Sequence, residues 1–97
     1  MQFELKNNEL LRQFETRIEG KLIKIEYSAQ PRKLFLTGFS IDQGLEKEKY
    51  QESFILAVFD FLADQDQKAF PTSLTIAKVF KKYREKYKHL LPLGISL

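Results

Sequence analysis

The sequence predicts a single α/β domain, of the α+β kind, spanning residues 1–97. Three observations predict this class. Apolar and polar residues alternate over residues 11–41, as they do in half-buried strands. From residue 54 the apolar spacing changes to three and four residues, the period of a helix. Hydrophobic residues make up 43% of the chain, which is enough for one compact core at this length.

Three segments early in the chain fit strands: residues 11–18, 21–27 and 33–41. The first two are separated by Glu19-Gly20, where the glycine can take a positive φ and close a tight turn. A second turn at residues 28–32 contains Pro31, which cannot donate to a strand ladder. Because the connections are short, these three strands are predicted to form an antiparallel meander.

The third predicted strand is expected to be central. Strict alternation gives it two apolar sets on opposite faces: Phe35, Thr37, Phe39 and Ile41 on one, Leu34 and Leu36 on the other. We therefore expect helices on both faces of the sheet.

Two helices are predicted, near residues 46–64 and 75–89. Their apolar stripes contain Ile55, Val58, Phe59 and Leu62 in the first, and Ile76, Val79, Phe80, Tyr83 and Tyr87 in the second. Residues 68–71 between them form a short strand that should pair in parallel with the third strand. The predicted order is β-β-β-α-β-α, with residues 1–9 as a loose N-terminal arm or a short edge element.

Composition excludes several kinds of site. The chain has no cysteine and one histidine, His89, so neither a thiolate nucleophile nor a metal site is expected. No apolar run approaches the ~20 residues that span a bilayer, and the start is not a signal peptide. We therefore expect a cytoplasmic protein that does not contact membranes. The net charge of +3 does not by itself indicate nucleic acid.

Four strings in this order resemble the GNAT acetyltransferase superfamily, in particular its small single-domain bacterial members: residues 22–27 (LIKIEY), 36–39 (LTGF), 54–59 (FILAVF) and 73–78 (SLTIAK). The resemblance covers roughly residues 7–91. Leu36 stands where these members carry a histidine, and Leu74 where they carry a cysteine. A leucine at position 74 is expected to pack, buried, between the last strand and the last helix.

The resemblance implies acetyl-CoA as a cofactor. GNAT enzymes hold its pyrophosphate on a glycine-containing turn, where backbone N–H groups and the helix dipole favour negative charge. Residues 45–51 contain no glycine here, and Glu46 and Glu48 oppose a pyrophosphate. We expect weak or no binding. The implied cofactor-binding candidates are Phe39, Ile41, Lys47, Lys49, Tyr50 and Gln51.

Four residues are candidates for catalysis. The resemblance implies a tyrosine in the last helix as general acid, which gives Tyr83 and Tyr87; both also fit core positions. Ser73 would position an acyl group or amine, or else cap the last helix. Glu26 would be a general base if it faced a cleft, and otherwise is an exposed strand carboxylate.

The densest charge lies in residues 78–88, which contain six basic residues and one acid: Lys78, Lys81, Lys82, Arg84, Lys86 and Lys88, with Glu85. Lysines and tyrosines together suit nucleic acid, but a helix with one core face also needs a polar outer face. The solvated face is the interpretation that we favour.

Three functions follow. The first is a non-catalytic interaction or ligand-sensing protein, with a GNAT-like fold whose cofactor and catalytic positions are degenerate. The second is an active acetyl-CoA-dependent N-acetyltransferase with an atypical cofactor loop. The third and most remote is a small nucleic-acid-binding domain. The partner is a protein or small molecule that the sequence does not name, and the apolar breadth of residues 54–62 also fits a homodimer.

Overall fold

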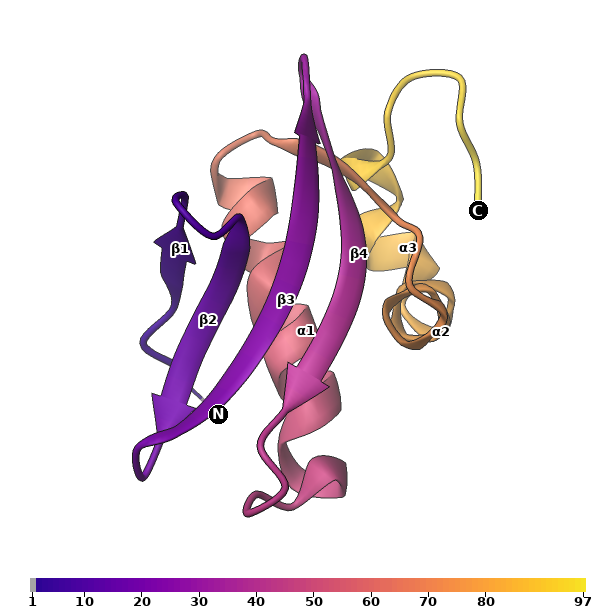
Figure 1. The fold of residues 1–97 in the computed structure, drawn as a ribbon. Coiled ribbons are helices and arrows are strands. Elements are labelled where there is room, and N and C mark those ends of the chain that lie inside the picture. Colours follow the sequence, from indigo (N-terminus) through magenta and orange to yellow (C-terminus); the bar gives the residue numbers. More distant parts are fainter. Residues whose placement is uncertain (1) are drawn as a thin grey trace.

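A computed structural model describes residues 2–97, which form a five-stranded mixed sheet with helices beside it (Figure 1). The elements are β1 (Lys6–Asn8), β2 (Gln13–Ile18), β3 (Lys21–Gln30), β4 (Lys33–Ile41), α1 (Lys47–Asp64), β5 (Lys68–Pro71), α2 (Leu74–Lys82), α3 (Arg84–Tyr87) and the 3₁₀ turn η1 (Lys88–Leu90). β1 to β4 pair antiparallel in sequence order, and β5 pairs in parallel with β4. The mixed α+β class, the meander and the parallel pairing are confirmed. Within residues 2–97, no helix is both long and apolar enough to cross a bilayer.

The N-terminal segment contains an edge strand. Residues 6–8 pair with β2, so the structure has a strand ahead of the predicted order. Before it, the ring of Phe3 meets Phe54 edge-on at 5.5 Å between centroids. Of the two expectations for residues 1–9, the short edge element is the one found over residues 2–9. Met1 lies outside the described residues.

The two predicted turns are tight. Glu19 and Gly20 have φ of 52° and 78°, the pair of positive values that a two-residue hairpin needs. The second turn is shorter than expected, because β3 continues to Gln30 and only Pro31 and Arg32 connect it to β4. Arg32 takes the positive φ there, at 66°.

A register shift between Glu26 and Tyr27 changes which residues of β4 share a face. Ile25 pairs with Phe39 but Tyr27 pairs with Leu36, so β4 has one extra residue, Thr37. The Thr37 hydroxyl donates to the carbonyl oxygen of Glu26 at 3.2 Å. Such a β-bulge reverses the alternation that follows it.

The predicted faces of the third strand are therefore wrong. Paired residues lie on the same face, so Leu34 and Leu36 share the core face with Phe39 and Ile41, and of the strand's large apolar residues Phe35 alone points the other way. With its apolar residues gathered on one face, the strand needs covering on one side only.

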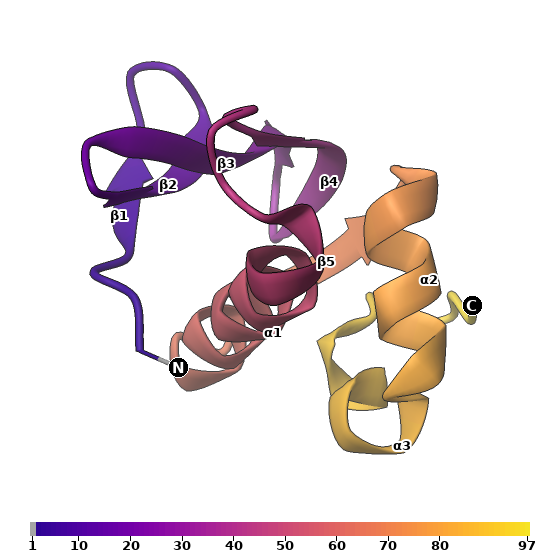
Figure 2. The same cartoon turned by 90° about the horizontal axis from the view of Figure 1, so that it is seen from below.

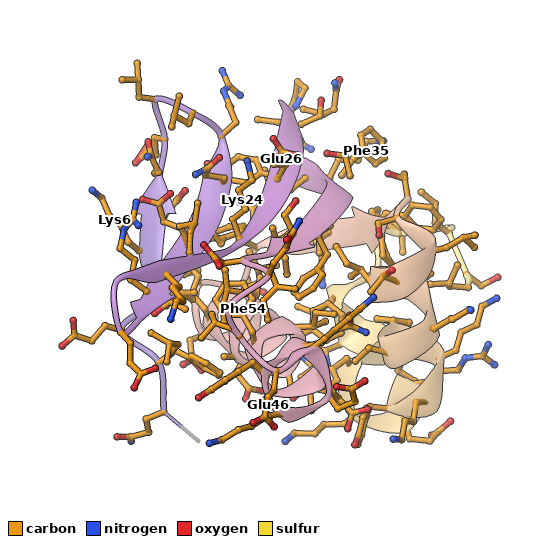
Figure 3. All side chains as sticks on the ribbon, turned by 60° about the horizontal axis from the view of Figure 1, so that its bottom comes forward. Lys6, Lys24, Glu26, Phe35, Glu46 and Phe54 are labelled. Carbon is orange, nitrogen blue, oxygen red and sulfur yellow. The ribbon has the colours of Figure 1, made fainter. Side chains whose placement is uncertain are left out.

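Both long helices lie on this core side. α1 buries Phe54, Ile55, Val58, Phe59 and Leu62. The Phe59 ring lies 5.9 Å from Phe80 of α2 and 5.2 Å from Tyr87 of α3, so the helices pack directly together. Figure 2 shows α1 along one side of the sheet with α2 next to it. Figure 3 shows Lys24, Glu26 and Phe35 on the open face. The expectation of helices on opposite faces is wrong.

The last helix is not continuous. It breaks at Tyr83, whose φ of −115° and ψ of 29° are not helical, so the prediction of one helix over residues 75–89 is wrong. The break redirects the chain and lets both Tyr87 and Leu90 become buried. The returning segment reaches β5, where the Lys68 ammonium donates to the carbonyl of His89 at 2.6 Å.

Leu74 is exposed, at 78% of its full accessible area, which contradicts the expected burial. It is the first residue of α2, and the buried stripe of that helix begins only at Ile76. Leu36, at 1%, is fully buried on β4, which lies between β3 and the edge strand β5.

Replacing Leu36 by alanine should lower the free energy of unfolding by about 2–5 kcal/mol, since the substitution leaves a cavity in the core. Leu74→Ala makes the same chemical change at the surface and should stay within about 0.5 kcal/mol of the parent. Urea unfolding followed by circular dichroism measures both. Equal losses in the two variants would contradict this assignment of core and surface.

Candidate functional site

A cavity of about 400 Å³ opens between the core face of the sheet and the C-terminal end of α1. The segments that line it lie toward the upper end of the molecule in Figure 1, where β1 ends, β2 begins and α1 ends. Its floor is apolar and consists of Phe14, Tyr27, Leu34, Phe61 and Leu62. Cavities of this size, with apolar walls and a few polar groups, are typical small-molecule sites.

Three aromatic rings meet at the floor. Phe14 is buried, and its ring centroid lies 4.9 Å from that of Tyr27 and 5.8 Å from that of Phe61. The strands fix Phe14 and Tyr27 on the core face, while Phe61 comes from the last turn of α1. Their edges and faces form a surface against which an apolar group can pack.

The rim of the cavity is polar, with five side chains around the opening: Asn7, Glu9, Arg12, Gln65 and Gln67. The Tyr27 hydroxyl donates to Asn7 Oδ1 at 2.7 Å, and Gln67 Nε2 donates to the carbonyl of Lys68 at 2.9 Å. These bonds hold two rim amides in place and leave Asn7 Nδ2 and Gln67 Oε1 free to face a ligand.

Arg12 has an unusual backbone. Its φ of 57° lies in the left-handed region that side chains other than glycine seldom adopt. Its carbonyl oxygen accepts a hydrogen bond from the Tyr27 N–H at 2.9 Å, which ties the β1–β2 turn to β3 beside the cavity.

Sequence reasoning did not find this cavity. Its residues come from three separated stretches, 7–14, 27–34 and 61–67, and none of the stretches contains a motif. The positive φ of Arg12 has no sequence signal, because no glycine stands there.

The predicted cofactor residues lie at the other end of α1. Lys47 and Lys49 are exposed, and the Lys49 ammonium lies over the Tyr50 ring at 5.3 Å. Glu46, the N-cap of α1, makes no side-chain capping bond. Gln51 is half-buried, and its Oε1 atom is buried without a hydrogen-bond partner.

Phe39 and Ile41, the two cofactor candidates on β4, are half-buried against the core on the inner face of the strand. Lys47 and Gln51 share an open hollow with Glu48 and Glu52. The structure therefore brings two of the six predicted cofactor-binding residues, Lys47 and Gln51, into one hollow. The other two residues of that hollow are carboxylates.

Tyr83 and Tyr87 both donate hydrogen bonds to carboxylates of α1. Tyr83 reaches Glu52 at 2.7 Å, and Tyr87 reaches Asp60 at 2.7 Å. The bond to Glu52 raises the pKa of Tyr83, while burial followed by the bond to Asp60 raises the pKa of Tyr87 further. A raised pKa makes a phenol a weaker proton donor, so these bonds favour a structural role in joining α2 and α3 to α1.

Ser73 and Glu26 occupy local structural positions. Ser73 is the N-cap of α2, and its hydroxyl oxygen accepts from the backbone N–H of Ile76 at 3.4 Å. Glu26 is exposed on the open face of the sheet and pairs with Lys24 at 3.5 Å. Neither residue lines the cavity.

The basic segment at residues 78–88 is partly neutralised. Lys82 pairs with Glu52 at 3.0 Å and Lys88 with Glu85 at 3.3 Å. The pairing with Tyr83 and then with Lys82 lowers the pKa of Glu52. Tyr87 is buried, so its ring cannot stack on bases, while the Tyr83 ring is half-buried and its hydroxyl is bonded to α1.

No group of three or more metal-ligating side chains gathers anywhere in residues 2–97. No protein-family model, curated protein or solved structure matches the chain.

Removing the Tyr87 hydroxyl with Tyr87→Phe should lower the free energy of unfolding by about 1 kcal/mol at neutral pH, because the Asp60 bond is lost. The matched variant Tyr83→Phe loses a bond from a half-buried tyrosine, whereas Tyr87 is buried, and should change stability less. Chemical denaturation of both variants measures the difference.

The same residue should make stability depend on alkaline pH. Tyr87 keeps its proton in the folded state above its ordinary pKa near 10, whereas the unfolded chain releases it. Stability should therefore be intact below about pH 10 and fall as the pH rises above that value. Tyr87→Phe should remove part of this slope; an unchanged slope in the variant would argue against the assignment.

Proposed function

We propose that this chain is a non-catalytic ligand-sensing domain of GNAT-like architecture that binds a small molecule in the cavity at the C-terminal end of α1. One observation carries the proposal: this aromatic-floored cavity lies at the opposite end of α1 from Lys47 and Lys49. α1 has 18 residues, which at 1.5 Å per residue separates its ends by about 27 Å. A ligand in the cavity would leave the candidate cofactor positions empty.

The start of α1 gives further support. A backbone cradle for a pyrophosphate needs glycines, and residues 45–51 have none. Lys47 and Lys49 would have to bind through long exposed side chains, whose immobilisation costs roughly 0.5–1.5 kcal/mol each. Glu48 and Glu52, which line a hollow together with Lys47, repel an anion.

The hydrogen bonds of Tyr83 and Tyr87 also support a non-catalytic function. A general acid has to release its proton during the reaction, but Tyr83 and Tyr87 are both bonded to carboxylates that hold that proton in place. Their raised pKa values make release harder still.

The second candidate function is an acetyl-CoA-dependent N-acetyltransferase. The buried Oε1 atom of Gln51 favours it, because an acceptor without a partner is costly and a donor on a bound ligand would satisfy it. In that case the cofactor would lie near the start of α1, and the cavity would have no part in the reaction.

Calorimetry with acetyl-CoA at physiological salt separates the two candidates. We expect no binding tighter than about 100 µM, and no release of free CoA thiol when acetyl-CoA is incubated with a panel of amines. Lys47→Ala/Lys49→Ala serves as the control, since any specific binding should weaken in it. Micromolar affinity together with steady thiol release would overturn the proposal in favour of the enzyme.

A further inference from the structure

Two opposite charges stand on the rim of the cavity, close together in the chain. Glu9 and Arg12 both line it and both belong to the β1–β2 turn. Within residues 2–97 neither side chain takes part in a salt bridge or a side-chain hydrogen bond. A cation and an anion on one rim, each without such a partner and both above an apolar floor, are complementary to a small zwitterion with an apolar group.

Building on the proposed function, we propose that the cavity binds a free α-amino acid with an apolar or aromatic side chain. The carboxylate lies against Arg12, the ammonium against Glu9, and the side chain on the aromatic floor. This arrangement uses both rim charges, whereas a simple carboxylate would leave Glu9 facing an anion.

Arg12 suits the carboxylate. A guanidinium presents two parallel N–H donors that match the two oxygens of a carboxylate. Because the Arg12 carbonyl is bonded to the Tyr27 N–H, the root of this side chain is fixed beside the floor. Asn7 Nδ2 is a second donor on the same rim, since its partner atom Oδ1 is already bonded to Tyr27.

Glu9 suits the ammonium. An ammonium carries three N–H donors and needs acceptors, which the Glu9 carboxylate and the free Oε1 of Gln67 provide. Gln65 adds another amide at the same opening.

The floor selects the side chain. Phe14, Tyr27 and Phe61 offer ring faces and edges, and Leu34 and Leu62 complete an apolar surface. A polar side chain would lose its hydration there without gaining a partner. Phosphorylated ligands are disfavoured, because Arg12 is the sole cationic side chain in the described lining.

Titration of the ¹⁵N-labelled full chain, followed by amide chemical shifts, tests the proposal. The probes are L-phenylalanine, L-leucine, 3-phenylpropionate, which lacks the ammonium, and 2-phenylethylamine, which lacks the carboxylate. We expect L-phenylalanine to bind about tenfold more tightly than either half-molecule, with shifts centred on residues 7–14, 27–34 and 61–67.

Two variants locate the site. Arg12→Gln should weaken L-phenylalanine about tenfold and leave 2-phenylethylamine within about twofold. Its matched control is Arg32→Gln, because Arg32 is also an exposed arginine with positive φ, at 66°, and lies outside the cavity. Ala29→Trp places a large ring at the exposed edge of the cavity without removing a core residue, and should abolish binding while the chain stays folded.

Several results would overturn the inference: no shifts with any probe, equal affinity for 3-phenylpropionate and L-phenylalanine, or unchanged binding in Ala29→Trp. A failure of the non-catalytic proposal would be detected by a different measurement, the release of free thiol from acetyl-CoA, and not by these titrations. Amino-acid binding that survives in a chain with acetyltransferase activity would support this inference and overturn the non-catalytic proposal.

Discussion

The burial of one side of α1 is the constraint on which the rest of the arrangement depends. The inner face of the sheet covers the helix from one direction. From another, α2 and α3 reach it through Phe80 and Tyr87 packed on Phe59, and through the hydrogen bonds to Glu52 and Asp60. Burial of apolar area is the main favourable term in folding, so elements gather around this helix. Within residues 2–97 no helix covers the outer face of the sheet, which stays open and carries mostly polar side chains.

Periodicity predicted the existence of nearly every element, because alternation and helical spacing reflect which side chains are buried. Predictions from periodicity were wrong where tertiary contacts determine the local structure. The sequence of residues 33–41 does not reveal that Thr37 is an extra residue, because apolar and polar side chains alternate regularly on either side of it. Likewise the apolar spacing from Ile76 to Tyr87 fits an unbroken helix. The break at Tyr83 accompanies the packing of Tyr87 on Phe59 of α1, a tertiary contact that the spacing does not reveal. The expected burial of Leu74 followed from the GNAT resemblance. Its place ahead of the buried apolar stripe of α2, which begins at Ile76, leaves it exposed.

The site was the least predictable part, for a physical reason. Sequence patterns reveal functional residues when they are close in the chain, as in a glycine-rich turn or a run of lysines. The charged runs here begin α1 or lie on the surface of α2 and α3, where their charges are partly paired. The cavity is instead formed where side chains from one end of the sheet, on β1 to β4, meet the last turn of α1 and the residues after it. Such a site becomes visible only when the fold has placed those segments together.

The extra residue in β4 also shapes how the gene can change. Thr37 is exposed and contributes one hydroxyl bond, so many side chains would serve at this position. Losing its codon would leave Leu36, Gly38 and Phe39 consecutive, so Leu34, Leu36, Phe39 and Ile41 would keep one face and β4 would pair with β3 without the bulge. A residue inserted between Phe39 and Ile41, where no bulge absorbs it, would instead turn Ile41 into water. Lineages descending from this chain would thus be free to vary or to lose Thr37, while the spacing of the residues on either side of it stays fixed.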